Sequence, residues 1–241
     1  MLTTDSILGL YRTFAADLKT VRRQQYWFHR RHDNAVVRRL RKWRLRRFML
    51  FPALDDLEAE ITYLLIRARR PKVIVEMSPN AGWSTTWILS GLRDNADGGQ
   101  LWSYDVHDTS TKLVPKALAQ GRWHFVKGDA RETTAKSPDF DYLFIDSDHS
   151  KEFAEWYVQS LFPRIRPGIP VSVHDVFHAA TPSQEGAVVL DWLRRKGVPF
   201  WTPSRQTSGE AARHIRAERE RLGLDYKIHH SDRNPMLFFE V

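Results

Sequence analysis

Beyond residue 52, short runs of apolar residues alternate with segments in which apolar residues recur at helical spacing. Strands that are separated by helices in this way form right-handed βαβ units and a mostly parallel sheet. The pattern therefore predicts an α/β, Rossmann-like fold, with seven strands and helices on both faces. The predicted strands are residues 72–76, 101–105, 123–126, 142–146 and 171–175, a short strand near 200, and 236–241. The main predicted helices are residues 54–68, 85–92, 111–119, 151–162, 187–196 and 210–222.

Residues 1–52 have a different pattern, which predicts an N-terminal helical appendage to a domain spanning 53–241. An amphipathic helix is expected from about Asp5 to Val21, because apolar residues return every three or four positions. A second is expected from Asn34, a residue that caps helices well, to about Phe48. Residues 26–31, between them, are both aromatic and basic.

Positive charge is concentrated in this appendage. The 241 residues carry a net charge of +8, but residues 1–50 hold 13 Lys or Arg and three Asp, a balance of +10 that leaves −2 for the rest. Such a segment suits an anionic partner, whether nucleic acid, acidic lipid or a phosphorylated substrate. The interpretation we favour is a solvated helix face that packs on the main domain or on a second subunit. We therefore expect a homo-oligomer formed through the N-terminal helices.

Composition excludes several classes of site. The sequence has no Cys, so disulfides, thiolate metal sites, iron–sulfur clusters and a Cys nucleophile are ruled out. No apolar run approaches the ~20 residues that span a bilayer. Because residues 1–10 lack a basic start followed by an apolar stretch, no secretory signal is visible, and a cytoplasmic location is expected.

Polar residues stand where the five central strands end. In parallel sheets of this kind, ligands bind outside the carboxyl ends of the strands. We therefore expect the functional site at this edge. The residues in question are Glu76, Asp105, Asp129, Asp146 and the pair His174–Asp175.

The loop after the first strand indicates the type of ligand. Residues 76–85 contain neither the three glycines of a dinucleotide fingerprint nor the Gly-Lys-Ser/Thr of a P-loop. A ligand without a pyrophosphate is therefore favoured. Asp105 ends the second strand, where an acid can accept hydrogen bonds from both hydroxyls of a ribose. A nucleoside that has no phosphates and carries a positive centre is S-adenosylmethionine.

Three segments together resemble one family. Residues 76–85 look like the first motif of class I S-adenosylmethionine-dependent methyltransferases, in the form E-x-x-x-x-x-G-x-S-T. Residues 145–150 and 173–177 resemble two further motifs of the subgroup that includes macrocin O-methyltransferase, cephalosporin-cluster enzymes and related sugar O-methyltransferases. The similarity extends over residues 53–241, and the N-terminal residues lie outside it.

The resemblance implies a set of cofactor contacts. Glu76 and Gly82 would border the methionine moiety, and Asp105 would hold the ribose. Ser84 would cap the following helix and bind the carboxylate of the ligand near the helix N-terminus. Residues 128–130 would face the adenine. The implied cofactor-binding residues are Glu76, Ser78, Gly82, Ser84, Asp105, Asp129, Ala130 and Asp146.

The resemblance also implies a catalytic pair and a metal. His149, three positions past Asp146, would be the general base, and Asp146 would be catalytic beside it. In the subgroup a divalent cation is held by an acid after the fourth strand and an acidic pair after the fifth, which here gives Asp146, His174 and Asp175. Mg²⁺ suits such oxygen ligands. His174 replaces an acid, so that Mn²⁺ is the alternative, and Asp148 is an alternative ligand. A His149 bonded only to Asp148 or the backbone is the structural alternative to a base.

These features predict an S-adenosylmethionine-dependent O-methyltransferase that acts on a hydroxyl of a polar small molecule, in the first place a sugar or a glycosylated metabolite. The competing interpretation is an RNA ribose O-methyltransferase, or a nucleic-acid-binding protein that uses the basic N-terminal arm. Methylation of base amines is disfavoured, because residues 146–149 lack the Asn/Asp-Pro-Pro-aromatic turn of those enzymes. A non-catalytic binding module with the same fold is the third hypothesis.

Overall fold

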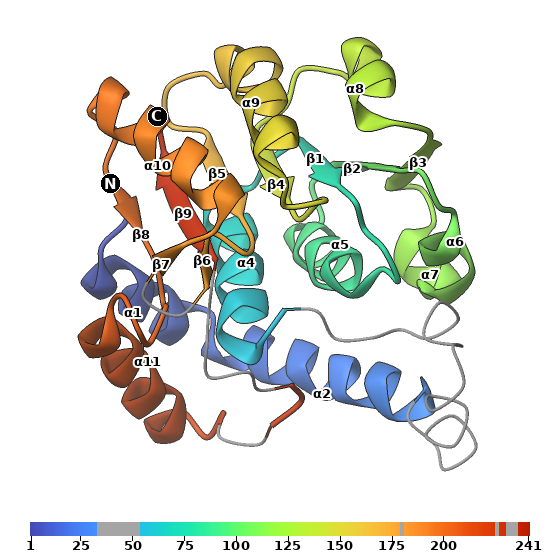
Figure 1. Ribbon diagram of the computed structural model, residues 1–241. Coiled ribbons are helices and arrows are strands. Elements are labelled where there is room, and N and C mark those ends of the chain that lie inside the picture. The colour runs from blue at the N-terminus through green and yellow to red at the C-terminus, as the bar shows by residue number, and fades with distance from the viewer. Residues whose placement is uncertain (33–53, 179–180, 225–226, 230–235) are drawn as a thin grey trace, which may run out of the picture.

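A mostly parallel sheet forms the centre of the computed structural model (Figure 1). The structure describes residues 1–32, 54–178, 181–224, 227–229 and 236–241. Among these residues the large sheet has the strand order β3-β2-β1-β4-β5-β9-β8, in which β9 runs antiparallel to both of its neighbours. The Rossmann-like fold with seven strands is thus confirmed. The strands are β1 (Val73–Met77), β2 (Gln100–Asp105), β3 (Trp123–Lys127), β4 (Tyr142–Ile145), β5 (Pro170–Val173), β8 (Phe200–Trp201) and β9 (Leu237–Glu240).

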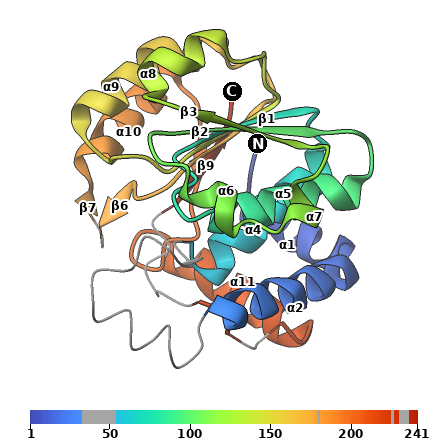
Figure 2. The same ribbon diagram turned by 90° about the vertical axis from the view of Figure 1, so that its right-hand side faces the viewer.

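Helices cover both faces of the sheet, as Figure 2 shows with the sheet nearly edge-on. One face carries α8 (Ala130–Thr133), α9 (Lys151–Ser160) and α10 (Gln184–Lys196). The other carries α4 (Asp56–Arg69), α5 (Trp83–Asn95), α6 (Thr109–Leu113) and α7 (Lys116–Ala119). Beyond this second layer lie α1 (Thr4–Thr13), α2 (Ala15–His32) and α11 (Gly209–Arg221).

Alternation along the strands divides the core into two clusters. Ile74 of β1 and Phe144 of β4 pack in the cluster that includes α4 and α5, whereas Val75 and Ile145 pack in the cluster under α9 and α10. Neighbouring residues of a strand point to opposite faces, so a strand that is covered on both sides is apolar at every position. This is why the central strands read as continuous apolar runs.

The N-terminal helices differ from their prediction. One helix was expected to end near Val21, but α1 ends at Thr13 with Phe14 as its C-cap, and α2 then continues from Ala15 to His32. Residues 26–31, expected between two helices, lie within α2, where no Pro or Gly interrupts the helix. The helix predicted from Asn34 to Phe48 lies outside the described residues.

The apolar faces of α1 and α2 are buried against the rest of the chain. Ile7, Tyr11, Leu18 and Val21 are fully buried in the cluster that contains α4 and α5. The boundary between residues 1–52 and 53–241 remains a prediction. Residues 1–32 nevertheless share a core with the sheet domain, so these apolar side chains are used within the chain.

Buried charges reinforce this packing. Arg22 of α2 and Arg219 of α11 both pair with Glu60 of α4, and Asp56 lies within 3.5 Å of both guanidinium groups. Tyr11 donates a further hydrogen bond of 2.8 Å to Glu60. Two carboxylates balance two guanidinium groups here, which offsets the cost of burying charge.

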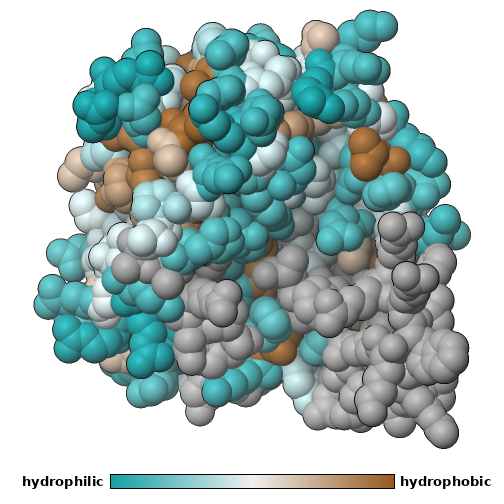
Figure 3. All heavy atoms as spheres, viewed as in Figure 1, coloured by the Kyte–Doolittle hydropathy of each residue, from teal (hydrophilic) through white to brown (hydrophobic). Residues whose placement is uncertain are grey.

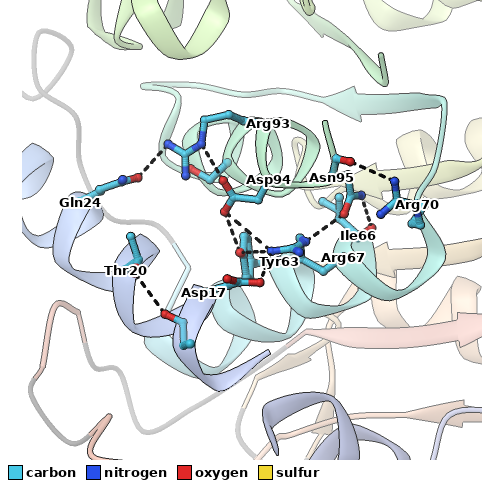
Figure 4. A network of polar contacts seen from close by, with 12 residues as sticks. Asp17, Thr20, Gln24, Tyr63, Ile66, Arg67, Arg70, Arg93, Asp94 and Asn95 are labelled. Carbon is cyan, nitrogen blue, oxygen red and sulfur yellow. Dashed lines mark hydrogen bonds and ion pairs between the residues drawn. The ribbon is translucent and has the colours of Figure 1, made fainter. Parts of the chain in front are cut away.

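A second polar network joins α2, α4 and α5 near the surface (Figure 4). Arg67 of α4 lies at its centre, 2.7 Å from the Asp17 carboxylate and 2.9 Å from Tyr63 Oη. Tyr63 donates a hydrogen bond to Asp94 of α5, and Arg67 donates another to Asn95. These bonds fix α2 against the two helices that cover this face of the sheet.

Proline and a small hairpin cause the remaining differences from the predicted elements. The expected helix over residues 111–119 is two short helices, α6 and α7, because Pro115 separates them. Between β5 and α10 the chain also forms a hairpin of β6 (Phe177–His178) and β7 (Thr181–Pro182), which the pattern did not indicate.

The described part of the chain contains no candidate membrane-spanning helix. None of its helices combines the length and the apolar character needed to cross a membrane. Figure 3 shows hydrophilic side chains over most of one face, with hydrophobic ones gathered chiefly over α10.

Candidate functional site

The carboxyl ends of the parallel strands bring the predicted site residues to one edge of the sheet. Met77 of β1 is in register with Tyr104 of β2 and Ile145 of β4, and Ile145 is in register with Val173 of β5. The residues that end or follow these strands are therefore neighbours. Four non-glycine residues in these loops have positive φ angles, namely Ser78, Asn80, His149 and Asp175. Such backbone strain clusters at functional sites.

The loop between β1 and α5 turns tightly by means of left-handed residues. Ser78 (φ 57°) donates its amide to the Tyr104 carbonyl at 2.8 Å, and Asn80 (φ 48°) donates to Asp105. Gly82 (φ 91°) is the N-cap of α5. A Cβ at Gly82 would lie 2.5 Å from Val114 Cγ2, so this position needs glycine for its conformation and for the close approach of α6.

Gly82→Ala should therefore lower the free energy of unfolding by about 2 to 4 kcal/mol, because backbone strain and a close contact coincide. Gly98 is the matched control, since it also has a positive φ (80°) but a Cβ added there would meet no described atom within 4 Å. Gly98→Ala should cost only the ~1 kcal/mol of the left-handed conformation. Urea denaturation of both variants measures the difference, and equal losses would contradict a role for the contact with Val114.

Glu76 lies in a cage of hydroxyl groups. Its carboxylate is completely buried and accepts hydrogen bonds from Ser84 (2.7 Å), Thr85 (3.0 Å) and Ser103 (2.5 Å). Burial raises the pKa of Glu76 to about 7, although the three hydroxyls act in the opposite direction. The carboxyl group of Glu76 thus connects β1 to β2 and to the first turn of α5 through hydrogen bonds.

The predicted role of Ser84 as a helix cap is wrong. The N-cap of α5 is Gly82, which has no side chain to accept a hydrogen bond, and Ser84 lies inside the helix. Its hydroxyl donates to Glu76, because that buried carboxylate is the nearest strong acceptor. Contact between Ser84 and a bound ligand remains a prediction.

The pKa of Glu76 predicts a pH-dependent stability. A folded-state pKa near 7, above the ordinary 4.5, means that the folded protein binds the proton more tightly than the unfolded chain. Stability should therefore fall as pH rises from about 4.5 to 7, by roughly 3 kcal/mol in total. Glu76→Gln does not titrate, so its stability relative to wild type should increase over this range.

Thermal unfolding of both proteins between pH 5 and 8.5 measures the effect. Glu132→Gln is the control, because Glu132 is exposed on α8. A constant difference between Glu76→Gln and wild type across this range would show that the buried carboxyl group does not titrate as stated.

Asp105 joins the first two loops of the edge. One carboxylate oxygen accepts from the Asn80 amide and the other from the His107 amide, both at 2.9 Å. The side chain of Asp105 is mostly buried. Each carboxylate oxygen can accept a second hydrogen bond, so Asp105 retains acceptor capacity for a ligand.

The residues after β3 have local structural roles. Asp129 caps α8 by accepting from the Arg131 amide, and it also forms an ion pair of 2.6 Å with the Arg131 guanidinium group. The hydrogen bonds from Arg131 hold the pKa of Asp129 below its ordinary value. Ala130 is buried in the apolar cluster under α9 and α10. Their predicted contact with adenine stays a prediction.

Acidic and imidazole groups alternate across the ends of β4 and β5. Asp146 lies 3.2 Å from His174 Nδ1, and His174 Nε2 in turn lies 3.4 Å from the Glu58 carboxylate of α4. Burial alone would lower the pKa of His174, but Asp146 and Glu58 outweigh it and raise that pKa well above its ordinary value. His174 therefore lies buried between two carboxylates that favour its protonated form.

His149 continues this series on the other side of Asp146. Its Nε2 atom lies 3.6 Å from Asp146 and 3.2 Å from Asp175, and its Nδ1 atom lies 2.8 Å from the Glu185 carboxylate of α10. Burial would lower the pKa of His149, but the bond to Glu185 and the charges of the three carboxylates raise it. The alternative in which Asp148 satisfies His149 is not seen, because Asp148 caps the turn at the Ser150 amide.

Asp146 is charged in this arrangement. Burial acts to raise its pKa, yet His174 and His149 together hold the pKa below the ordinary value. The next residue, Ser147, has a buried hydroxyl group without a hydrogen-bond partner among the described residues. The end of β4 thus presents a carboxylate and a free hydroxyl group to the edge of the sheet.

The geometry offers a second candidate set of metal ligands beside the predicted one. Among the described residues, ligand atoms of Asp146, His149 and Asp175 lie within 4.8 Å of one another, and His174 is not part of this group. His174 Nδ1 nevertheless lies 3.2 Å from Asp146 and 3.6 Å from Asp175. The set of Asp146, His174 and Asp175 stays a prediction, and the set of Asp146, His149 and Asp175 is a second candidate.

Sequence reasoning missed two carboxylates of this site, Glu58 and Glu185. Both occur in the first turn of a helix, where acids are common because they suit the helix dipole. Glu58 also completes a capping box with Asp55. These local roles explain both residues without any contact to a histidine. Each is also far in sequence from the histidine that it faces, so the contact could not be predicted from the sequence.

Comparison with known proteins agrees with the fold and indicates a methyltransferase. Residues 75–176 match a family model described as a methyltransferase domain. A Mycobacterium sp. (strain JLS) protein named as an O-methyltransferase is 29% identical over 118 residues, which are 46% of this chain and 51% of that protein. A Mycobacterium tuberculosis (strain H37Rv) protein, also named as an O-methyltransferase, is 32% identical over 92 residues, or 35% and 40% of the two chains. The chain thus spans about half or less of the length of these relatives.

Solved structures show the same fold at low identity. The O-methyltransferase TomG from Streptomyces achromogenes, in complex with SAM, aligns with a TM-score of 0.55 and 15% identity over 100% of this chain and 99% of that chain. The SAH-bound methyltransferase PaMTH1 from Podospora anserina aligns with a TM-score of 0.52 and 15% identity over 76% and 82%. In sequence the chain is thus similar to O-methyltransferases over part of its length, and residues 75–176 match the methyltransferase-domain model, while the solved structures share its fold.

Proposed function

We propose that this protein transfers the methyl group of S-adenosylmethionine to a hydroxyl group of a polar small molecule, of the sugar or glycosylated-metabolite class. The observation that carries the proposal is the position of His149. This half-buried imidazole lies in the loop after β4, and the Glu185 carboxylate holds its Nδ1 atom. The similarity to O-methyltransferases supports the reaction type. The acceptor class rests on the resemblance of residues 145–150 and 173–177 to sugar O-methyltransferases.

The cofactor would lie across the loops that follow β1 and β2. Asp105 would accept hydrogen bonds from the ribose hydroxyls with the lone pairs that Asn80 and His107 leave free. The left-handed turn from Ser78 to Gly82 would border the methionine moiety, as in a nucleoside site without phosphate contacts. Asp129 and Ala130 would lie near the adenine, at the end of β3.

The reaction requires a proton acceptor. As the acceptor oxygen bonds to the methyl carbon, the carbon–sulfur bond breaks and its electron pair stays on sulfur, which gives S-adenosylhomocysteine. The hydroxyl proton must leave at the same stage, and a positioned base contributes typically about 10² to 10⁴-fold to such steps. His149 Nε2 would take this proton, because its Nδ1 atom is already engaged by Glu185. Asp146 and Asp175 would stabilise the resulting imidazolium.

The donor set also fits a divalent cation. Two carboxylates and one imidazole from Asp146, Asp175 and His149 are suited to Mg²⁺ or Mn²⁺, with open positions left for a substrate. Such a cation would lower the pKa of a bound hydroxyl group. His149 Nε2 has one lone pair, so binding a cation through it and accepting a proton with it exclude each other.

A methyl-transfer assay tests the function. Isotopically labelled S-adenosylmethionine is incubated with the protein and a panel of saccharides, glycosylated macrolides and phenols, with EDTA or with added Mg²⁺ or Mn²⁺. Label should appear in a saccharide-type acceptor. Full activity in excess EDTA would eliminate the cation, and the absence of both cofactor binding by calorimetry and transfer to any acceptor would overturn the proposal.

The competing function, RNA ribose methylation or nucleic-acid binding, depends on the basic N-terminal segment. Within its described part, Arg12 and Arg22 pair with acids of α11 and α4 and are not directed to a ligand. Binding to RNA that weakens steeply with salt would favour this function. Size-exclusion chromatography of the full chain with light scattering tests the proposed homo-oligomer, and a monomeric mass would contradict it.

A further inference from the structure

Glu185 is a buried carboxylate that neither the proposed cofactor site nor the proton acceptor includes. Its side chain is 1% exposed, in the first turn of α10. One oxygen lies 2.8 Å from His149 Nδ1, and the other accepts a hydrogen bond of 2.9 Å from Tyr157 Oη. The two oxygens thus join α9, α10 and the loop after β4.

These partners determine the hydrogen position on His149. A carboxylate only accepts hydrogen bonds, so the His149 nitrogen that faces Glu185 must carry a hydrogen. A neutral imidazole has one N–H, and its other nitrogen then bears the lone pair. That other nitrogen is Nε2, which lies 3.2 Å from Asp175 and 3.6 Å from Asp146 but forms a hydrogen bond with neither, so the neutral ring keeps its hydrogen on Nδ1.

Glu185 lies in a capped, closely packed helix, whereas His149 lies outside regular secondary structure. His149 has a φ of 60° and lies in a loop, outside any helix or strand. Glu185 is on a helix that is capped by Ser183 and packed so closely on β5's continuation that a Cβ at Gly186 would lie 2.0 Å from the Val176 carbonyl oxygen. The position of the imidazole is therefore set from α10.

We propose that Glu185 is the positioning residue for His149: it holds the ring in the Nδ1–H tautomer and directs the Nε2 lone pair toward the acceptor side of the sheet edge. The catalytic consequence rests on the proposed methyl transfer, but the tautomer does not. Partners of this kind typically alter activity by about 10 to 100-fold when they are lost.

Three substitutions separate the hydrogen bond from the charge. Glu185→Gln removes the charge but keeps an oxygen that can accept from His149, whereas Glu185→Leu removes both. Glu185→Asp keeps the charge and withdraws it by one methylene group. Tyr157→Phe is the control, because it removes the other hydrogen bond to Glu185 and leaves His149 untouched.

Nuclear magnetic resonance of protein with ¹⁵N-labelled His, in EDTA and above the pKa of His149, reports the tautomer directly. His149→Gln identifies the signals. Wild type, Tyr157→Phe and Glu185→Gln should show the Nδ1–H form, and Glu185→Leu should shift toward the Nε2–H form that free imidazole prefers. If Glu185→Leu does not fold, a mixed population in Glu185→Asp carries the test.

Turnover with the acceptor from the panel provides the second readout. We expect kcat to fall at least about tenfold in Glu185→Leu with KM for S-adenosylmethionine unchanged, and to recover in Glu185→Gln. A Glu185→Leu protein that folds and keeps the Nδ1–H form would overturn the proposal. If the Leu variant does not fold, a Glu185→Asp protein with the same tautomer as wild type would overturn it. A shifted tautomer in a protein without any methyl transfer would instead contradict the proposed function and leave the positioning role intact.

Discussion

His149→Gln is expected to lower kcat for methyl transfer by two to four orders of magnitude. The substitution removes the imidazole whose Nε2 atom lies beside Asp146 and Asp175 after β4 and would accept the hydroxyl proton. A general base typically contributes about 10² to 10⁴-fold. The affinity for S-adenosylmethionine should stay unchanged, because the proposed cofactor contacts lie at β1 and β2. Single-turnover measurement of labelled methyl transfer, with calorimetry of cofactor binding, gives both quantities.

The matched control is His178→Gln. His178 is exposed on β6, in the hairpin that follows β5, and its carbonyl accepts a hydrogen bond from Thr181 of the same hairpin. Its substitution should leave kcat within a factor of about two. If His149→Gln retained a comparable kcat, His149 would not be the base, and the proton would have to leave by another route.

Asp105→Ala should weaken the binding of S-adenosylmethionine by at least about 100-fold, the second large effect. Hydrogen bonds to a charged group contribute about 1.5 to 3 kcal/mol each, and a ribose offers two hydroxyl donors. A 100-fold loss corresponds to ~2.7 kcal/mol, which is within that range. The substitution also frees the amides of Asn80 and His107, so part of the loss would come from a less ordered loop.

Asp108→Ala separates local charge from this specific role. Asp108 lies in the same loop but is half-exposed, and its ion pairs are with Lys112 and Lys127 at the surface. Its removal should change the cofactor Kd little. Calorimetry of both variants, with thermal unfolding as a check on folding, decides the matter. An Asp105→Ala protein that is folded and binds S-adenosylmethionine as wild type does would exclude Asp105 from the site.

The distribution of strain agrees with these expectations. Of the non-glycine residues with positive φ, Arg70 and Ala96 terminate helices, a position where the left-handed conformation is common. The other four are in the loops after β1, β4 and β5. His149 and Asp175 are two of them, and both belong to the candidate cation site. The molecule thus concentrates conformational strain at the sheet edge where the proposed chemistry takes place.

Local sequence determined the strands, most helices and the edge at which the site lies. Continuous apolar runs such as residues 142–145 need cover on both faces, which leaves a parallel sheet with helices on each side as the simple solution. Once the strands are parallel, their carboxyl ends share one edge. The positions of Glu76, Asp105 and Asp146 at that edge could therefore be predicted without a structure.

Only the tertiary structure decided which atoms face one another. His149 and Glu185 are 36 positions apart, and His174 and Glu58 are separated by more than 100, so no local periodicity relates them. The sequence places His174 after β5, but it does not show that α4 brings the Glu58 carboxylate to the second ring nitrogen. Sequence patterns record which face of an element is buried. The pairing of polar groups from different elements depends on how helices pack across the sheet, and this is settled only when the whole chain has folded.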